Sequence, residues 1–280
     1  MKIRILEVGP RDGLQNEKKL VPLEQKYALI ELLIKAGLTH IEAGAFVNPK
    51  AVPQMADSKD LLKSVIKDFP EVTFHSLVPN LMGLENALNA GVKNIGLLTA
   101  CSETFTQKNL NTSIKGSITR IAEILEECPK GIFKRLYLSM SFHSPWEGVI
   151  SNEIFSNTLE RCADLGVDEI VISDTTGKGT PDLVNNRIFL SQKFFGVDKI
   201  ACHFHDTYNN GLANIKESIK CRVDKFDSSI NGLGGCPYSP GASGNISTDS
   251  LVDFCIENNI ETSISRENLK IASEYVKSIL

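Results

Sequence analysis

Apolar residues recur along the chain at two alternating spacings, one typical of helices and one typical of short buried strands. In residues 22–35 they fall three or four positions apart, and Pro22 and Gly37 stand where helices commonly begin and end. Short apolar-rich runs, such as residues 4–9 and 39–44, lie between segments of this kind and end in glycine. We therefore expect strands and helices to alternate along the chain.

The alternation comprises eight strand–helix units, which is the number found in a (β/α)8 TIM barrel of the α/β class. The predicted strands span residues 4–9, 39–44, 72–78, 94–99, 133–141, 169–173, 199–205 and 225–230. The predicted helices span residues 22–35, 58–67, 81–90, 113–128, 152–165, 181–195, 211–221 and 248–258, and an additional C-terminal helix spans 266–279. A doubly wound open sheet shows the same alternation and stays the structural alternative. No low-complexity linker interrupts the chain, so residues 1–280 are expected to form a single domain.

Composition and charge narrow the class of protein. A hydrophobic content of 42% allows a sizeable core, and a net charge of −4 gives no general attraction to nucleic acid or to an anionic membrane. Seven cysteines without regular spacing do not suggest a disulfide framework and favour a reducing compartment. The chain starts on a strand-like run and contains no apolar stretch of about 18 residues. We expect a cytoplasmic protein with no membrane or nucleic-acid partner.

Polar side chains stand at or just after the ends of several predicted strands, where barrel enzymes carry their chemistry. These residues are Arg11, Asp12, Glu42, Ser139, Ser141, Asp174, His203, His205 and Asn231. Position alone does not establish a site, because loops face water in any α/β protein and are polar for that reason.

His203 and His205 are two residues apart, so on a strand both rings point to the same side and could hold one metal ion. Together with Asp12 they form a mixed nitrogen and oxygen set that suits a divalent cation with open positions. Two purely structural interpretations stay open as alternatives to metal binding. The histidines could cap a strand and form hydrogen bonds with the backbone, or one of them could form a salt bridge with Asp12.

Residues 232–245 carry five glycines and two prolines around Cys236, a composition that allows sharp bends and close approach to a ligand. We interpret this segment as a lid, with an ordinary connection as the alternative. Cys236 is a candidate proton donor or nucleophile, whereas the other six cysteines lie in or beside predicted strands and helices and are expected in the core.

Three motifs together resemble the 3-hydroxy-3-methylglutaryl-CoA lyase family, which lies among the metal-dependent TIM-barrel lyases that also include isopropylmalate and homocitrate synthases. They are VGPRDGLQNE at residues 8–17, CHFHDT at residues 202–207 and the glycine-rich segment at residues 232–245. The resemblance covers nearly the whole chain. The Gly-Gly-Cys-Pro-Tyr run within the third motif is similar to the lyases and is not expected in the synthases.

The resemblance implies a role for each matching residue. Asp12, His203, His205 and Asn245 match ligands to Mg²⁺ or Mn²⁺. Arg11 matches the arginine that stabilises an enolate, Glu42 a buried acid near it, Asp174 an active-site carboxylate and Cys236 the cysteine that transfers a proton. His203 matches an acid/base at the tertiary hydroxyl as well, and Gln15 and Lys18 match positions beside the acyl-CoA.

The activity implied is cleavage of 3-hydroxy-3-methylglutaryl-CoA to acetyl-CoA and acetoacetate by a metal-assisted retro-Claisen-type step, in leucine degradation or ketone-body metabolism. We also expect a homodimer or higher homo-oligomer. Ala45 stands where the family has a hydroxyl-bearing residue, which bears on the acyl pocket. The alternatives are a lyase for a longer 3-hydroxy-3-alkylglutaryl-CoA, an aldolase of 4-hydroxy-2-oxo acids, and a catalytically silent metal-binding barrel.

Overall fold

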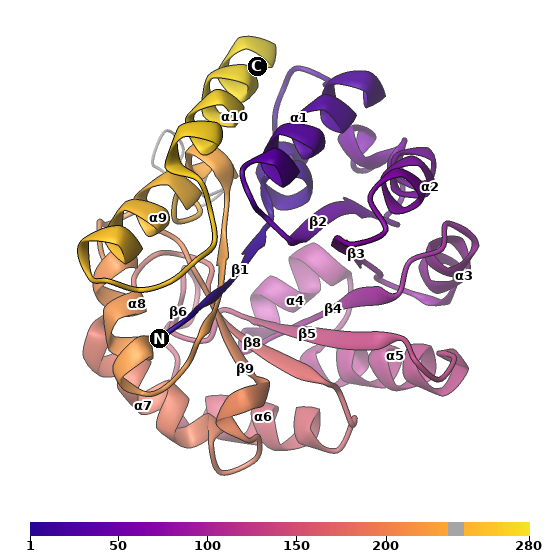
Figure 1. Ribbon diagram of the computed structural model, residues 1–280. Helices are drawn as coiled ribbons and strands as arrows, with labels where there is room; N and C mark the ends of the chain where they lie inside the picture. The colour runs from indigo at the N-terminus through magenta and orange to yellow at the C-terminus, as the bar shows by residue number, and fades with distance from the viewer. Residues whose placement is uncertain (235–243) are drawn as a thin grey trace.

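Eight parallel strands close into a barrel at the centre of the molecule (Figure 1). The computed structural model describes residues 1–234 and 244–280. The barrel strands are β1 (Arg4–Glu7), β2 (His40–Ala45), β3 (Thr73–Leu77), β4 (Asn94–Ala100), β5 (Phe133–Ser139), β8 (Glu169–Asp174), β9 (Ile200–Phe204) and β10 (Lys225–Ser228). Pairing of β1 with β10, from Arg4 opposite Lys225 to Glu7 opposite Ser228, completes the ring. The predicted TIM barrel is confirmed and the open sheet is wrong.

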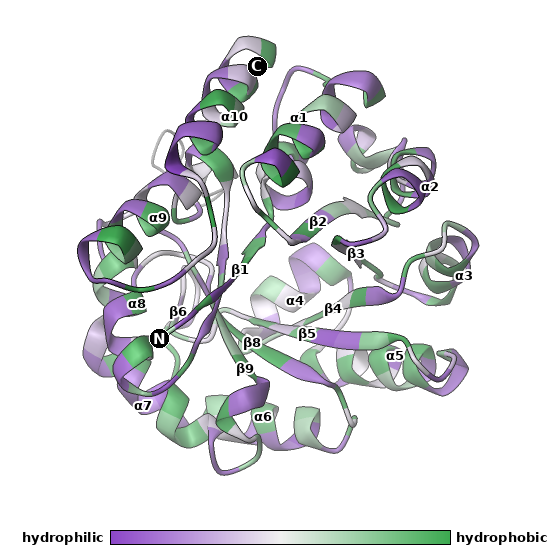
Figure 2. Ribbon diagram, viewed as in Figure 1, coloured by the Kyte–Doolittle hydropathy of each residue, from purple (hydrophilic) through white to green (hydrophobic). Residues whose placement is uncertain are grey.

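Helices surround the barrel, as the apolar spacing predicts. The helix that follows each strand is α1 (Leu23–Lys35), α2 (Ser58–Asp68), α3 (Leu81–Asn89), α5 (Ile114–Glu127), α6 (Asn152–Ala163), α7 (Pro181–Ser191), α8 (Gly211–Lys220) or α9 (Thr248–Glu257). Figure 2 shows that these helices carry both hydrophobic and hydrophilic residues. The additional helix α10 (Arg266–Ile279) buries Leu269, Ala272, Val276 and Ile279 and packs against α1 and α9. None of the helices in the described ranges is long and apolar enough to cross a membrane.

Several short elements outside the eight strand–helix units were not predicted. A π-helical turn, η1 (Gly9–Gly13), stands where the sequence indicates a loop, and α4 (Glu103–Leu110) lies between β4 and α5. A small hairpin pairs β6 (His143–Ser144) with β7 (Gly148–Val149), and three 3-10 turns are η2 (Pro53–Met55), η3 (Val197–Lys199) and η4 (Ile230–Gly232). Apart from η3, which precedes β9, these elements follow strands and lie at the rim of the barrel rather than in its wall.

The inside of the barrel is partly charged. Glu42, Arg135 and Asp227 come from β2, β5 and β10 and are no more than 2% exposed. Gly96 on β4 makes room for this arrangement, since a Cβ atom there would lie 3.1 Å from the Tyr137 ring and 3.4 Å from the Glu42 carboxylate. Charged side chains are rarely buried unless they are paired. Their presence inside this barrel therefore points to a functional site nearby.

Candidate active site

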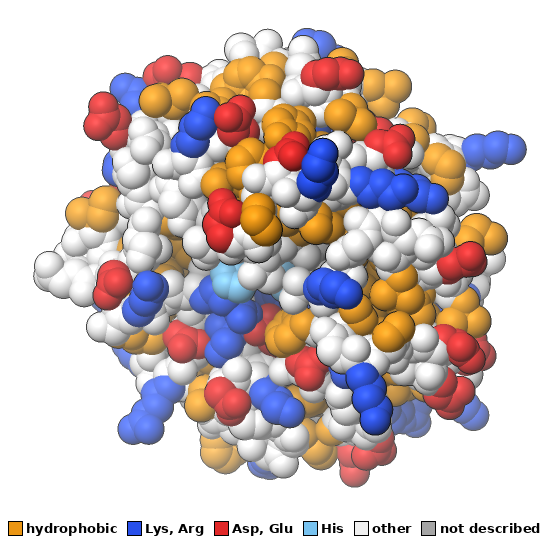
Figure 3. Space-filling view, turned by 45° about the vertical axis from the view of Figure 1, so that its right-hand side comes forward, with side chains coloured by type: hydrophobic (Ala, Val, Ile, Leu, Met, Phe, Trp, Pro, Cys, Tyr) orange, Lys and Arg blue, Asp and Glu red, His pale blue; other side chains and the backbone are white. Residues whose placement is uncertain are grey.

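A cavity of about 380 Å³ opens at the carboxyl ends of the strands. One part of its lining is polar and comes from Arg11, Asp12, Gln15, Ser139, Ser173, Thr175 and His203. The other part is apolar and includes Val47, Leu77, Val78, Leu98, Phe105, Leu110 and Ile121. Figure 3 shows one face of the molecule, on which hydrophobic, basic and acidic side chains are interspersed around a hollow that holds a histidine. The cavity can therefore take a molecule with both polar and apolar parts.

The turn η1 carries Arg11 and Asp12 into this cavity. Glu7, at the end of β1, holds the turn in place: one carboxylate oxygen accepts hydrogen bonds from the amides of Gly9 and Ile230, each at 2.8 Å. Its other oxygen accepts from the Thr248 hydroxyl at 2.5 Å. Burial raises the pKa of Glu7 to about 7 despite these hydrogen bonds. A single buried carboxyl thus joins η1 to η4 and to the start of α9.

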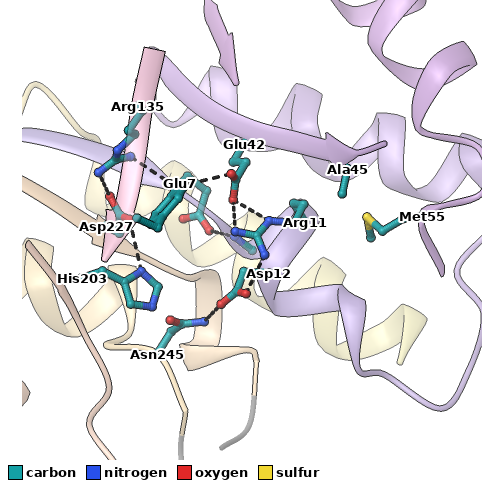
Figure 4. Close-up of polar contacts among 12 residues, drawn as sticks. Glu7, Arg11, Asp12, Glu42, Ala45, Met55, Arg135, His203, Asp227 and Asn245 are labelled. Atoms are coloured by element: carbon teal, nitrogen blue, oxygen red, sulfur yellow. Dashed lines mark hydrogen bonds and ion pairs between the residues drawn. The ribbon is translucent and has the colours of Figure 1, made fainter. Parts of the chain in front are cut away.

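Arg11 lies between two carboxylates (Figure 4). Its Nε donates to Glu42 Oε2 at 2.6 Å, its Nη2 lies 2.5 Å from the same oxygen, and its Nη1 donates to Asp12 Oδ1 at 2.8 Å. Burial would lower the pKa of Arg11, but the two carboxylates outweigh that effect and raise it. Burial raises the pKa of Glu42, and the charge of Arg11 opposes the rise. The guanidinium is therefore permanently charged and held in one orientation.

Asp12, His203 and His205 form the one cluster of metal-ligating side chains found among the described residues, with ligand atoms all within 4.8 Å of one another. Burial would raise the pKa of Asp12, but Arg11 and the histidines lower it to about 2, so the carboxylate is ionised. Burial lowers the pKa of His205 to about 3, which keeps its ring neutral and able to donate a lone pair. The prediction that these three residues converge is confirmed.

Asn245 adjoins the same cluster, and a backbone bridge joins it to His205. Its Nδ2 donates to Asp12 Oδ2 at 2.8 Å and to the carbonyl of Leu233 at 2.9 Å. Its Oδ1, like His205 Nδ1, is buried and has no hydrogen-bond partner in the described part of the chain. Buried acceptors are normally satisfied, so an unpaired oxygen beside a carboxylate and two imidazoles fits a divalent cation.

Asp174 ends β8, and its pKa is raised by burial to about 6. Its Oδ2 accepts a hydrogen bond from the amide of Gly179 at 2.7 Å, whereas its Oδ1 is buried without a partner among the described residues. Its carbonyl accepts from the amide of His205 at 3.3 Å, which places the residue beside the metal-ligand cluster. A carboxyl with these properties can hold a proton near neutral pH.

The other residues predicted for the site do not all lie at the cavity. Gln15 lines the cavity, but Lys18 is exposed and is not part of its lining. Asn231 donates to the carbonyl of Ser273 at 2.8 Å, toward α10 and away from the cavity. Cys236 and most of the predicted lid fall at residues 235–243, outside the described residues. Of the six other cysteines, Cys101, Cys162, Cys202 and Cys255 are buried as expected, and Cys128 and Cys221 are partly buried.

Three residues that the sequence reasoning did not single out lie against the predicted ones. The Tyr137 hydroxyl donates to Glu42 Oε1 at 3.3 Å, and Asp227 Oδ2 lies 3.1 Å from His203 Nδ1. Arg135 Nη2 donates to the other oxygen of Asp227 at 2.6 Å (Figure 4). The sequence does carry a signal for Arg135 and Asp227, because charged residues inside predicted strands are unusual.

Ala45 ends β2 and is 1% exposed. Its amide donates to the Ser58 hydroxyl at 3.1 Å, and that hydroxyl donates to the carbonyl of Met55 at 2.8 Å. Figure 4 shows Ala45 and Met55 on the far side of Arg11 from the metal-ligand cluster. A hydroxyl is thus present next to position 45, supplied by the first residue of α2 rather than by β2.

Comparison with known proteins connects this geometry to a chemistry. The HMGL-like family model matches residues 2–276. The mitochondrial hydroxymethylglutaryl-CoA lyase of Mus musculus is 41% identical over 276 residues, which span 98% of this chain and 85% of the relative. A 3-hydroxy-3-isohexenylglutaryl-CoA/hydroxymethylglutaryl-CoA lyase of Pseudomonas aeruginosa is 38% identical over 280 residues, covering 100% of this chain and 93% of the relative. The structure of an HMG-CoA lyase from Acinetobacter baumannii, in complex with coenzyme A and 3-methylmalate, superposes with a TM-score of 0.94 at 32% identity, covering 99% of this chain and 91% of that one.

Proposed function

The chain belongs to the HMGL-like family, and we propose that it is a lyase that cleaves 3-hydroxy-3-methylglutaryl-CoA to acetyl-CoA and acetoacetate. The observation that carries this proposal is the placement of Arg11 beside the Asp12, His203 and His205 cluster at the mouth of the barrel. The relatives named as lyases of this substrate, at 38% identity or more over almost the full chain, support it.

Asp12, His203, His205 and Asn245 would hold a divalent cation, for which we propose Mg²⁺ or Mn²⁺. When bound, the ion supplies Lewis acidity that lowers the pKa of the substrate's tertiary hydroxyl. Loss of the hydroxyl proton then allows the C2–C3 bond to break, which releases acetoacetate and leaves the enolate of acetyl-CoA.

Arg11 stabilises that enolate. A guanidinium has five N–H donors, and three of them face Glu42 and Asp12. One N–H on each Nη has no partner in the described part of the chain and can bind a ligand. The enolate oxygen carries its negative charge only once the bond is breaking, so these fixed donors bind the transition state more strongly than the substrate. The hydrogen bonds that Glu42 accepts from the guanidinium fix its orientation.

Proton transfer at the hydroxyl has two candidates in the site. His203 faces Asp227 through Nδ1, so both proposed roles of this histidine, as ligand and as acid/base, require Nε2. The two roles therefore cannot be filled at the same moment. Asp174, with a pKa of about 6, is the other candidate in the site that can take up a proton near neutral pH.

We propose that a different group, Cys236, donates the proton that the enolate carbon takes up.

The finer assignments follow the family. We propose that the acyl-CoA thioester lies along the cavity beside Gln15, with Lys18 nearer its outer end, and that residues 232–245 cover the bound substrate. The homo-oligomeric state, the cytoplasmic location and the part played in leucine degradation or ketone-body metabolism stay predictions from the sequence.

A release assay tests the proposed function. The protein, freed of metal and then given Mg²⁺ or Mn²⁺, is incubated with 3-hydroxy-3-methylglutaryl-CoA, with longer 3-alkyl homologues and with a 4-hydroxy-2-oxo acid. We expect metal-dependent release of acetyl-CoA and acetoacetate from the methyl substrate. If the protein turned over one of the other compounds but not 3-hydroxy-3-methylglutaryl-CoA, the proposal would be contradicted. If it turned over none of the compounds, a catalytically silent barrel would be favoured.

A further inference from the structure

A line of charged side chains runs through the barrel below the metal-ligand cluster. His203 Nδ1 lies 3.1 Å from Asp227 Oδ2, and Asp227 Oδ1 accepts from Arg135 Nη2 at 2.6 Å. Arg135 continues the line through Nε, which lies 3.0 Å from Glu169 Oε1. His203 is 8% exposed and the other three side chains are at most 2% exposed, so water cannot replace these contacts. The proposed reaction assigns no role to Asp227 or Arg135.

The donors and acceptors along this line of side chains allow only one position for the proton between Asp227 and His203. An arginine can only donate, so the oxygen of Asp227 that faces Arg135 must accept. The second oxygen of an ionised carboxylate is also an acceptor, so the proton between Asp227 and His203 belongs to His203 Nδ1. In a neutral imidazole the other nitrogen then carries a lone pair. Figure 4 shows that nitrogen on the side of the ring that faces Asp12 and Asn245.

We propose that Asp227, itself held by Arg135, is a positioning residue that fixes His203 in the tautomer whose Nε2 lone pair faces the metal position. Carboxylates that accept from the second nitrogen of a ligating histidine orient the ring and make it a better ligand. The inference rests on the metal-dependent function proposed above, but the tautomer itself can be measured without metal.

The Asp227→Asn variant reverses the order of donors in a side chain of the same shape. The amide oxygen must face Arg135, since two donors cannot bond to each other, and the amide NH₂ then faces His203 Nδ1. His203 Nδ1 has to accept, which moves the ring proton to Nε2 and removes the lone pair from the metal position. We expect Mn²⁺ binding to weaken by about 10–100-fold, as measured by calorimetry on the metal-free protein. Unchanged affinity in the folded variant would overturn the proposal.

The tautomer is read directly by NMR of ¹⁵N-histidine-labelled, metal-free protein at a pH where the ring is neutral, with the His203 signals assigned by comparison with His203→Gln. We expect the proton on Nδ1 in the wild type and on Nε2 in Asp227→Asn. A wild-type proton on Nε2 would overturn the proposal, and this measurement decides the matter even if the variant does not fold. If the wild type binds no metal, the proposed function fails, whereas the tautomer result still stands or falls by itself.

Glu169→Gln provides the matched control. It removes a buried carboxylate from the same arginine but does not touch His203. We expect its Mn²⁺ affinity to stay within about threefold of the wild type and its His203 tautomer to be unchanged, since the direct bond to Asp227 remains. An equal loss of affinity in Glu169→Gln and Asp227→Asn would attribute the effect to the loss of buried charge in general and would contradict a specific role for Asp227.

Discussion

At the scale of single residues, Arg11 is buried but has partners for only three of its five N–H groups among the residues that the structure describes. Glu42 occupies Nε and one N–H of Nη2, and Asp12 occupies one N–H of Nη1. A lysine at this position could not make the same set of contacts, because its ammonium group is not a planar fork. Arg11 therefore serves two purposes at once: it neutralises a buried acid and presents charge to the cavity.

Replacing Arg11 with methionine should lower kcat by roughly 10³-fold or more, because it removes the donors that meet the enolate oxygen. Mn²⁺ affinity, measured by calorimetry, should change far less because the ligands remain. Arg266→Met is a suitable control, since Arg266 pairs with Asp253 and is not part of the cavity lining. A kcat of Arg11→Met close to that of the control would refute the role.

His205 tests the metal site from a different direction. His205→Ala removes one imidazole from the cluster and should raise the concentration of Mg²⁺ or Mn²⁺ needed for half-maximal activity by about 10-fold or more. His143→Ala removes a histidine from the neighbouring hairpin that is not part of the cluster, and it should leave that concentration unchanged. Equal metal dependence in the wild type and in His205→Ala would exclude His205 as a ligand.

At the scale of elements, η1 and η4 belong to opposite ends of the chain and meet at Glu7. The hydrogen bond that Glu7 accepts from Gly9 joins the turn to the end of β1, and the one that it accepts from Ile230 joins it to η4. π-Helical turns are rare and often lie at functional sites. Here the turn sets the angle at which Arg11 and Asp12 enter the cavity, so the geometry of the site depends on a carboxyl outside it.

The raised pKa of Glu7 predicts a specific dependence of stability on pH. A carboxyl whose pKa is higher in the folded state, about 7 against 4.5, adds stability below pH 4.5 that is lost as the pH rises to about 7. Glu7→Gln cannot ionise, so its free energy of unfolding should lack this loss, which is on the order of 3 kcal/mol. Urea denaturation between about pH 5 and pH 8 measures the difference.

The comparison with Glu24→Gln, an exposed acid on α1, controls for the loss of one negative charge. Glu7→Gln should gain stability relative to the wild type as the pH rises, whereas Glu24→Gln should not. A constant difference between wild type and Glu7→Gln across this range would show that Glu7 has the same pKa in the folded and unfolded states.

At the scale of the whole molecule, ligand binding and folding are linked because the metal ligands come from both ends of the chain. Asp12 follows β1, whereas His203 and His205 lie at the end of β9 and Asn245 lies just before α9. An unfolded chain cannot bring these groups together, so a cation that binds them stabilises the closed barrel.

Addition of Mn²⁺ to metal-free protein should raise Tm, by an amount that corresponds to about 2.7 kcal/mol when the free ion is 100 times its Kd. Scanning calorimetry over a series of concentrations measures this shift. The increase should be smaller for His205→Ala at every concentration. A Tm that is independent of Mn²⁺ in the wild type would contradict the metal site.

Much of the fold could be predicted because its signals are local. Helical spacing and strand runs place the eight units within a few residues, and α10 has the predicted bounds. α4 was missed because its sequence is mostly polar and buries only Phe105 and Thr106. The π-turn η1 was missed because its cause is tertiary: the amide of Ile230 lies 223 residues along the chain from Glu7.

In the candidate site too, residues with a local signal could be predicted and residues brought together only by the fold could not. His203 and His205 can be paired from strand geometry, since their spacing puts them on one side. Asn245 has no local signal and entered only through the resemblance to a family. Arg135 and Asp227 stand on strands that the sequence places correctly, but only the closed barrel brings these two side chains within 2.6 Å.

The buried charges inside the barrel also set a limit on protein engineering. Barrel enzymes are often treated as interchangeable scaffolds on which the loops can be exchanged, because the wall is usually apolar and indifferent to the chemistry above it. That separation fails here: Glu42, Arg135 and Asp227 are part of the wall, and they hold the groups at the mouth. Loops grafted from this protein onto an apolar barrel would carry Arg11 but would leave Glu42, which holds its guanidinium, behind.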